Sequence, residues 1–249
     1  MKTPNEQFQI ECEQEIEAQG KDEVLRKLSY DWAHQAAMYK YGYHFTWLGR
    51  PIIQYPTDIL AMQEIIWEVK PDVIIETGIA HGGSIVFYAS MIELLKNNGI
   101  VIGVDIDIRK HNRTEIENHP LYRHIHMIEA SSIEETTLLE IQRIICEGDY
   151  KKILVVLDSC HTHEHVLREL QLYGHLVTKG SYLVCMDTVV GYDAISPQGN
   201  RPWNAERNPL SAVREFLQSP LGKRFYPDER IDHKLLISAA PTGYLKCIE

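Results

Sequence analysis

Cysteine is scarce in this sequence, and its pattern indicates neither a disulfide framework nor a zinc ribbon. The chain has 249 residues, and its five cysteines include no CxxC pair. Long apolar runs are also missing, since none approaches the roughly 18 residues that a membrane span needs. The N-terminal stretch MKTPNEQFQIECEQEIEAQG lacks the apolar segment of a signal peptide. We therefore expect a cytoplasmic protein with no membrane partner.

Positive charge is in deficit, and this argues against nucleic acid as a partner. The 25 Lys and Arg residues face 35 Asp and Glu residues, which gives a formal net charge of -10. Such a chain repels phosphate backbones and anionic lipid surfaces. A local pocket of backbone amides can still bind a phosphorylated metabolite, so the charge of a small-molecule ligand stays open.

Short apolar runs alternate with helical patterns over most of the chain. The predicted strands are 73–76, 101–105, 124–128, 153–158 and 182–187. This alternation predicts a doubly wound, Rossmann-like α/β fold whose mostly parallel sheet is covered by helices on both faces. Ligands bind such sheets at the carboxyl ends of the strands.

The two ends of the chain depart from this alternation. Residues 5–40 carry apolar positions at helical spacing, which predicts one or two amphipathic helices acting as a lid or an oligomer contact. We therefore divide the chain into an extension, 1–40, and a main domain, 41–249. The segments 234–241 and 243–248 are predicted to form an antiparallel hairpin at the sheet edge, and 189–210 is predicted to be a long loop.

A glycine-rich turn follows the first predicted strand in the motif IIETGIAHGGS. Glycine lets a ligand approach the backbone, and the helix N-terminus beyond it favours a negative group. The spacing is not GxGxxG, so a dinucleotide fits less well. Asp105, with Asp107 as the alternative, ends the next strand and is placed to accept ribose hydroxyls. Together they indicate an adenosine-bearing cofactor. Ser131 follows the third strand, where it lines the adenine edge, caps the next helix, or does both.

Acidic residues and histidines follow the fourth and fifth strands. Because neighbouring parallel strands end at one edge, we expect Asp158, His161 and Asp187 to converge there. A histidine flanked by carboxylates is suited to remove a hydroxyl proton. A zinc site on three alternate histidines is disfavoured, because helical residues two apart face different sides. His163 and His165 are instead expected to be capping or surface groups.

Several motifs together resemble the cephalosporin hydroxylase family, whose members are S-adenosylmethionine-dependent O-methyltransferases of antibiotic and sugar pathways. They are WLGRPIIQYPTDI, PDVIIETGIAHGGS, GVDIDIR, LDSCHTHEHVLRELQLYGHLV, RPWN and KLLISAAPTGYLK. The resemblance covers about residues 41–246. It implies a seven-stranded sheet whose last strand is antiparallel. It also implies a set of cofactor contacts: Glu76, Gly78, His81, Gly82 and Ser84 around the methionine part, Asp105 at the ribose, and Gln54 with Asp58 closing over the pocket.

The resemblance also bears on the acceptor and the metal. It implies that Trp203 offers a flat face to a sugar ring and that Arg201 binds a phosphate or carboxylate. The alternative is that this segment packs against a sister subunit. Some relatives hold Mg²⁺ at acidic residues where this chain has Cys160 and Met186. Sulfur is a poor Mg²⁺ ligand, so we disfavour a full magnesium site.

The predicted function is therefore methyl transfer from S-adenosylmethionine to a hydroxyl of a sugar or sugar-containing precursor, in a homo-oligomeric enzyme. One alternative is an NAD-dependent oxidoreductase that uses the same strand ends. The other is a cofactor-binding protein without catalysis.

Overall fold

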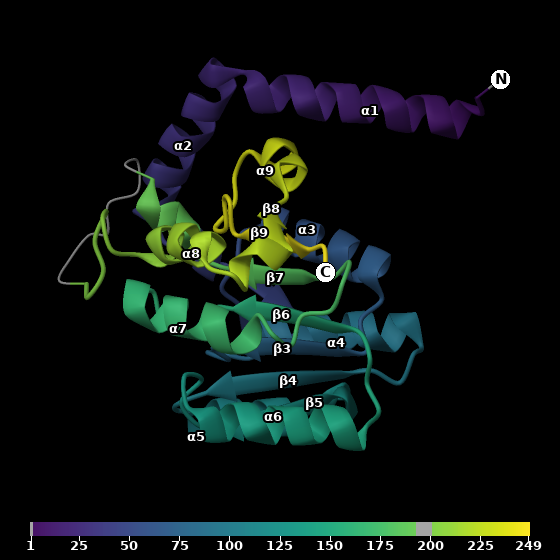
Figure 1. The fold of residues 1–249 in the computed structure, drawn as a ribbon, viewed down its shortest axis with the longest axis vertical. Coiled ribbons are helices and arrows are strands. Elements are labelled where there is room, and N and C mark those ends of the chain that lie inside the picture. Colours follow the sequence, from purple (N-terminus) through teal and green to yellow (C-terminus); the bar gives the residue numbers. More distant parts are fainter. Residues whose placement is uncertain (1, 193–200) are drawn as a thin grey trace.

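The computed structural model describes residues 2–192 and 201–249, and it is built around a seven-stranded sheet (Figure 1). The strands are β3 (Val73–Thr77), β4 (Ile100–Asp105), β5 (Ile125–Glu129), β6 (Ile153–Leu157), β7 (Tyr182–Cys185), β8 (Phe225–Pro227) and β9 (Tyr244–Cys247). Their order is β5-β4-β3-β6-β7-β9-β8. Strands β3 to β7 pair in parallel, whereas β9 is antiparallel to both of its neighbours. The predicted fold class is confirmed.

Helices cover both faces of the sheet. On one face lie α3 (Pro56–Val69), α4 (Gly83–Leu95) and α5 (Lys110–Glu117), and on the other α6 (Glu135–Glu147), α7 (His163–Tyr173) and α8 (Pro209–Gln218). The strands read as continuous apolar runs because alternate side chains enter opposite layers. In β3, Ile74 packs in the first layer, and Val73 and Ile75 pack in the second. Helix α5 was not predicted.

The carboxyl ends of the central strands form the edge at which a ligand is expected. Strand β3 pairs with β4 on one side and β6 on the other, and Thr77 is level with Val104 and Leu157. The chain connections diverge at this point, which is where doubly wound sheets open a binding crevice. The glycine-rich turn, Asp105 and Asp158 therefore follow neighbouring strand ends.

Two helices precede the main domain, as predicted. They are α1 (Pro4–Lys21) and α2 (Glu23–Ala37), and Figure 1 shows α1 lying beyond α9 (Glu229–Leu235), away from the sheet. Gln19 ties α1 to α9, because its Nε2 donates to the His233 carbonyl at 2.7 Å. Across residues 2–192 and 201–249, no helix combines the length and apolar character needed to cross a membrane.

Short elements complete the described chain: η1 (Tyr41–Tyr43), β1 (Phe45–Trp47), β2 (Arg50–Ile52), η2 (Tyr122–His124), η3 (Thr188–Gly191) and η4 (Gly222–Arg224). Strands β1 and β2 pair in a segment for which no regular structure was predicted. Residues 193–200 of the predicted long loop lie outside the described residues.

The predicted hairpin is half wrong. Segment 243–248 contains β9, but 234–241 forms no strand, and β9 pairs instead with β7 and β8. The reason is a tertiary contact: the Asp58 carboxylate accepts hydrogen bonds from Ser238 Oγ at 2.6 Å and Ala239 N at 2.8 Å. These bonds hold the segment against α3 instead of at the sheet edge.

Candidate active site

The glycine-rich turn after β3 has a backbone that only certain residues adopt comfortably. Gly78 and Gly82 have φ values of +89° and +83°, and Ala80 lies between them at +46°. A Cβ on Gly78 would stand 2.1 Å from the Asp158 carbonyl oxygen. Glycine is therefore required at residue 78 both by backbone conformation and by the close approach of the end of β6.

Two side chains that the sequence analysis missed hold the outer side of this turn. Arg50 Nη2 donates to the His81 carbonyl at 2.7 Å and to Asn112 Oδ1 at 3.0 Å. Asn112 Nδ2 in turn donates to the Ala80 carbonyl at 2.9 Å. Arg50 and Asn112 therefore hold two backbone carbonyls of the turn, those of His81 and Ala80, in place. Asn112 belongs to the unpredicted helix α5; it follows the family motif GVDIDIR closely, but no role was predicted for it.

Asp105 lies against the same turn, as predicted for a residue at the end of β4. Its Oδ2 accepts hydrogen bonds from Ile79 N at 2.8 Å and Ala80 N at 3.2 Å. The alternative, Asp107, has a side chain that is 72% exposed. Ser131 follows β5 and is half-buried. The N-cap of α6 is Glu134, without a side-chain cap, so the capping role suggested for Ser131 is wrong.

Glu76 and Gln54 are buried polar side chains with atoms that have no hydrogen-bond partner among the described residues. Glu76 Oε2 accepts from Ser84 Oγ at 2.6 Å, whereas Oε1 is unpaired. Burial raises the pKa of Glu76 to about 8. The side-chain polar atoms of Gln54 have no partner of good hydrogen-bond geometry either, although the buried Tyr88 hydroxyl lies beside both Gln54 and Glu76. Because buried unpaired groups are costly, this cluster beside the turn indicates a ligand-binding surface.

Asp58 does not join this cluster, and the prediction that it closes over the pocket is wrong. Besides its bonds to residues 238 and 239, its carboxylate accepts a hydrogen bond from Tyr244 OH at 2.7 Å. Burial raises its pKa to about 6. Helix α3 starts at Pro56 with Tyr55 as N-cap, which turns Asp58 inward toward the C-terminal segment. Its role is structural.

The structure brings Asp158, His161 and Asp187 together at the ends of β6 and β7. His161 Nδ1 lies 3.1 Å from Asp187 Oδ2. Asp187 has a left-handed φ of 55°, a conformation that aspartate tolerates better than most residues. Burial disfavours a charge on either group, but their mutual attraction outweighs it, so the pKa of His161 is raised and that of Asp187 is lowered.

Asp158 completes this arrangement from the other side of Asp187. It is half-buried, and its partial removal from water together with the Asp187 charge raises its pKa well above the usual range. A hydrogen bond between the two carboxyls favours a proton on Asp158 and a charge on Asp187, because it raises the pKa of Asp158 and lowers that of Asp187. The result is an imidazole whose orientation is set by a carboxylate that is itself held in place.

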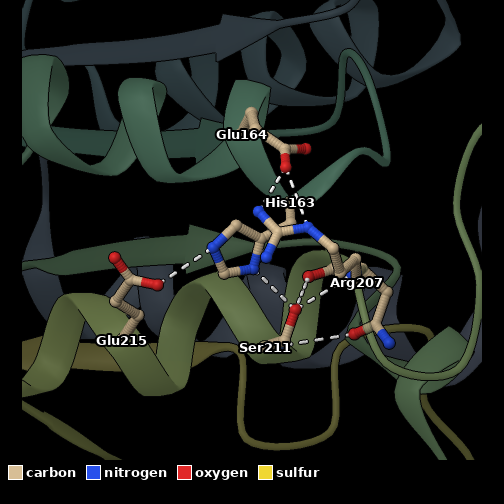
Figure 2. Close-up of polar contacts among 6 residues, drawn as sticks. His163, Glu164, Arg207, Ser211 and Glu215 are labelled. Atoms are coloured by element: carbon tan, nitrogen blue, oxygen red, sulfur yellow. Dashed lines mark hydrogen bonds and ion pairs between the residues drawn. The ribbon is translucent and has the colours of Figure 1, made fainter.

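The other two alternate histidines take partners away from His161. His165 Nε2 lies 3.1 Å from Ser132 Oγ and 3.2 Å from Ser159 Oγ. His163 is buried between α7 and α8 (Figure 2). The prediction that they are capping or surface groups is wrong, since Thr162 is the N-cap of α7, His163 is buried and His165 is half-buried against its serine partners. Within the described ranges, no group of three or more His, Cys, Asp or Glu residues is arranged to hold a metal ion.

Arg201 and Trp203 also reach this site. The Trp203 ring centroid lies 4.7 Å from that of His161, and the Arg201 guanidinium lies 5.3 Å from the Trp203 ring. Trp203 Nε1 is buried and has no partner among residues 2–192 and 201–249. An aromatic face, a guanidinium and an unpaired donor therefore lie beside the candidate base.

The oxygen donors for a divalent cation are the Asp158 and Asp187 carboxyls. The two carboxyls are adjacent and half-buried, and carboxylate oxygens with water in the remaining positions are the ligands that Mg²⁺ prefers. Cys160 Sγ lies 3.5 Å from Thr162 Oγ1, and Met186 is packed in the apolar core. The two sulfur side chains are thus engaged elsewhere, and their presence does not argue against this carboxylate pair.

Sequence comparison assigns most of the chain to one family. The family described as "Rhamnosyl O-methyltransferase/CmcI" matches residues 39–248. The rhamnosyl O-methyltransferase of Mycobacterium tuberculosis (strain ATCC 25618 / H37Rv) is 28% identical over 202 residues, which are 80% of this chain and 77% of that protein. The Mycobacterium leprae (strain TN) protein of the same name is 30% identical over 162 residues, covering 64% of this chain and 68% of its own.

Solved structures of CmcI share the fold. The apo form superposes with a TM-score of 0.58 at 16% identity, covering 83% of this chain and 77% of that one. A CmcI structure with Mg and SAM has a TM-score of 0.57 at 16% identity, covering 83% and 78%. Because Mg is present in that neighbour, the prediction that disfavours Mg²⁺ has no support. The motifs, the sheet and the family match agree: the chain belongs to the rhamnosyl O-methyltransferase/CmcI family of S-adenosylmethionine-dependent O-methyltransferases.

Proposed function

We propose that this protein methylates a hydroxyl of a sugar residue in a glycoside, with His161 as the general base. The observation that carries the proposal is the His161–Asp187 pair, which lies at the carboxyl edge of the sheet with the Trp203 ring against it. Curated relatives are named as rhamnosyl O-methyltransferases, which favours a rhamnose-like acceptor.

The cofactor is proposed to lie over the turn after β3. The unpaired Glu76 Oε1 is suited to accept a hydrogen bond from the methionine ammonium, and Gln54 offers further partners. The methionine carboxylate fits near His81, Gly82 and Ser84, where α4 begins. Asp105 retains lone pairs for the ribose hydroxyls, and Ser131 lies after the next strand, near the expected position of adenine.

His161 is proposed to take the proton of the acceptor hydroxyl on its Nε2, because Nδ1 faces Asp187. Asp187 holds the tautomer and stabilises the imidazolium that forms, and Asp158 lies beside Asp187. S-adenosylmethionine, when bound, supplies the methyl group: the C–O bond forms as the C–S bond breaks in one in-line displacement. The Trp203 ring excludes water and provides a face for the sugar.

A magnesium ion is proposed to bind at Asp158 and Asp187. When bound, it would supply positive charge that makes the acceptor hydroxyl more acidic. Arg201, whose guanidinium lies over Trp203, is placed to contact a negatively charged group on the acceptor.

Two measurements test this function. Calorimetric titration with S-adenosylhomocysteine, with NAD as the control ligand, should show binding of the first only. Incubation with S-adenosylmethionine, Mg²⁺ and an aryl α-rhamnoside should give a methylated glycoside that mass spectrometry detects. Binding without turnover on any glycoside would favour the cofactor-binding protein without catalysis, whereas NAD binding would favour the oxidoreductase.

The N-terminal helices are proposed to contact a second copy of the chain. They carry apolar side chains at the surface: Phe8, Val24, Leu28, Trp32 and Met38. Light scattering should show a dimer or larger assembly that dissociates in a Phe8→Glu, Leu28→Glu variant. A wild-type protein that is monomeric at micromolar concentration would refute this arrangement.

A further inference from the structure

We infer that His163 is a positioning residue that fastens the acceptor-binding segment 201–208 to the helix that follows the catalytic histidine. This inference rests on the proposed function for the meaning of the segment, but the contacts that carry it are independent of the acceptor. His163 is the first residue of α7 and is 5% exposed. It lies two positions after His161, and its ring points toward α8 (Figure 2).

The His163 ring contacts two residues of α8 that lie one helical turn apart. His163 Nδ1 lies 2.7 Å from Ser211 Oγ, and Nε2 lies 3.1 Å from Glu215 Oε2. A second clamp stands beside it, because Arg207 Nε donates to Glu164 Oε1 at 2.8 Å. Two consecutive residues of α7 thus hold the beginning of α8 and the residue just before its N-cap.

Ser211 links these clamps to the preceding segment. Its backbone N–H donates to Asn208 Oδ1 at 3.1 Å, and its hydroxyl lies 2.8 Å from the Asn208 carbonyl. Asn208, the N-cap of α8, is buried and donates through Nδ2 to the carbonyls of Asn204 and Ala205 at 2.9 and 2.8 Å. The fold of residues 204–208, which follow Trp203 directly, therefore depends on the place where α8 begins.

Ser211, His163 and Glu215 are arranged in the order of a Ser–His–acid triad. Their hydrogen bonds nevertheless indicate that Ser211 is not a nucleophile. Ser211 Oγ has one proton, and both His163 Nδ1 and the Asn208 carbonyl lie within reach of it. Its oxygen also accepts the Asn208 backbone N–H at 3.0 Å. A hydroxyl in a capping box is committed to the helix end, so the network fits a clamp rather than an attacking group.

The consequence for catalysis is geometric. The Trp203 ring contacts the His161 ring in a tilted arrangement, and the Trp203 backbone leads directly into residues 204–208, which Asn208 holds in place. Releasing α8 from α7 would leave the cofactor turn after β3 untouched but would loosen the Trp203 segment over the acceptor. Loss of His163 should therefore weaken acceptor binding and spare cofactor binding.

Three variants test this: His163→Ala, His163→Gln, which retains one donor and one acceptor, and His175→Ala as an exposed histidine control just beyond α7. Steady-state kinetics with an aryl α-rhamnoside should show KM raised about tenfold in His163→Ala, as expected for the loss of one to two hydrogen bonds. kcat and S-adenosylhomocysteine affinity should stay within about twofold of wild type. His163→Gln should recover part of the loss.

Hydrogen exchange provides the readout that does not need turnover. Amides of 204–212 should exchange faster in His163→Ala, while those of β3 and β6 stay protected. Unchanged exchange at 204–212, or a KM equal to that of the control, would overturn the inference. If wild type methylates no glycoside, the proposed function fails, yet the exchange comparison still decides the role of His163. If His163→Ala does not fold, Ser211→Ala and Glu215→Gln carry the same comparison.

Discussion

Replacing Glu76 by Gln should abolish a pH dependence of cofactor binding that the wild-type protein is expected to show. Burial raises the pKa of Glu76 to about 8, so the group is mostly protonated at pH 6. A methionine ammonium pairs with the ionised carboxylate, and binding must therefore expel the proton. With this pKa, about one molecule in a hundred is ionised at pH 6 and about half at pH 8. S-adenosylhomocysteine should bind about fifty-fold more tightly at pH 8.

For the protein without cofactor, Glu76 should have the opposite effect: stability, unlike cofactor affinity, should fall as pH rises. Its folded pKa of about 8 lies above the ordinary 4.5, so the folded state holds the proton more tightly than the unfolded state does. The free energy of unfolding should fall as pH rises between these values, by on the order of 5 kcal/mol in total. Glu76→Gln removes this loss. The variant should be more stable than wild type at pH 8 and bind cofactor less tightly there.

The assay is calorimetric titration with S-adenosylhomocysteine at pH 6, 7 and 8, with urea unfolding at the same three values. Glu140→Gln, an exposed glutamate on α6, is the matched control. The control should keep the wild-type slope of affinity against pH. A Glu76→Gln protein with that same slope, or a wild type whose affinity does not change from pH 6 to 8, would show that Glu76 does not bind the ammonium.

Three further predictions concern the other parts of the site. His161→Ala should lower turnover by roughly 10² to 10⁴ while cofactor binding persists, because only the base is lost; full turnover in the variant would exclude His161 as base. Gly78→Ala should be destabilised or fail to fold in chemical denaturation, because its Cβ meets the Asp158 carbonyl oxygen at 2.1 Å; wild-type stability would contradict this. Chelation of Mg²⁺ should lower turnover without changing S-adenosylhomocysteine affinity, and turnover unaffected by chelator would remove the metal from Asp158 and Asp187.

The sheet and its strand ends were predictable because their signals are local. Each central strand is buried on both faces and so appears as a continuous apolar run, and the observed bounds lie close to the predicted ones. Gly78 and Gly82 predict the turn after β3, because its backbone has positive φ values there that favour glycine. Once parallel pairing is assumed, the convergence of Asp158, His161 and Asp187 follows from their position after neighbouring strands.

The residues that were misread have partners far away in the sequence. Asp58 has the appearance of a helix cap, yet it is buried by bonds to residues 180 and 186 positions further on. Arg50 belongs to a short segment without a helical pattern. It is part of the site because it donates hydrogen bonds to the His81 carbonyl and to Asn112, both distant in the sequence. Arg50 lies in the motif WLGRPIIQYPTDI, which carries the family resemblance but does not reveal these partners.

The three alternate histidines show what spacing can and cannot decide. Their two-residue separation predicts rings on different sides, and the three rings have separate partners: Asp187, Glu215 and the Ser132–Ser159 pair. It could not assign the partners, which come from the segment after β7, from α8 and from the loops after β5 and β6. His161 lies in the loop between β6 and α7, where its ring contacts Asp187, whereas His163 is the first residue of α7 and contacts α8. The start of α7 therefore separates the two rings: His161 stays partly exposed beside Trp203, and His163 is buried against the helix that follows the Trp203 segment.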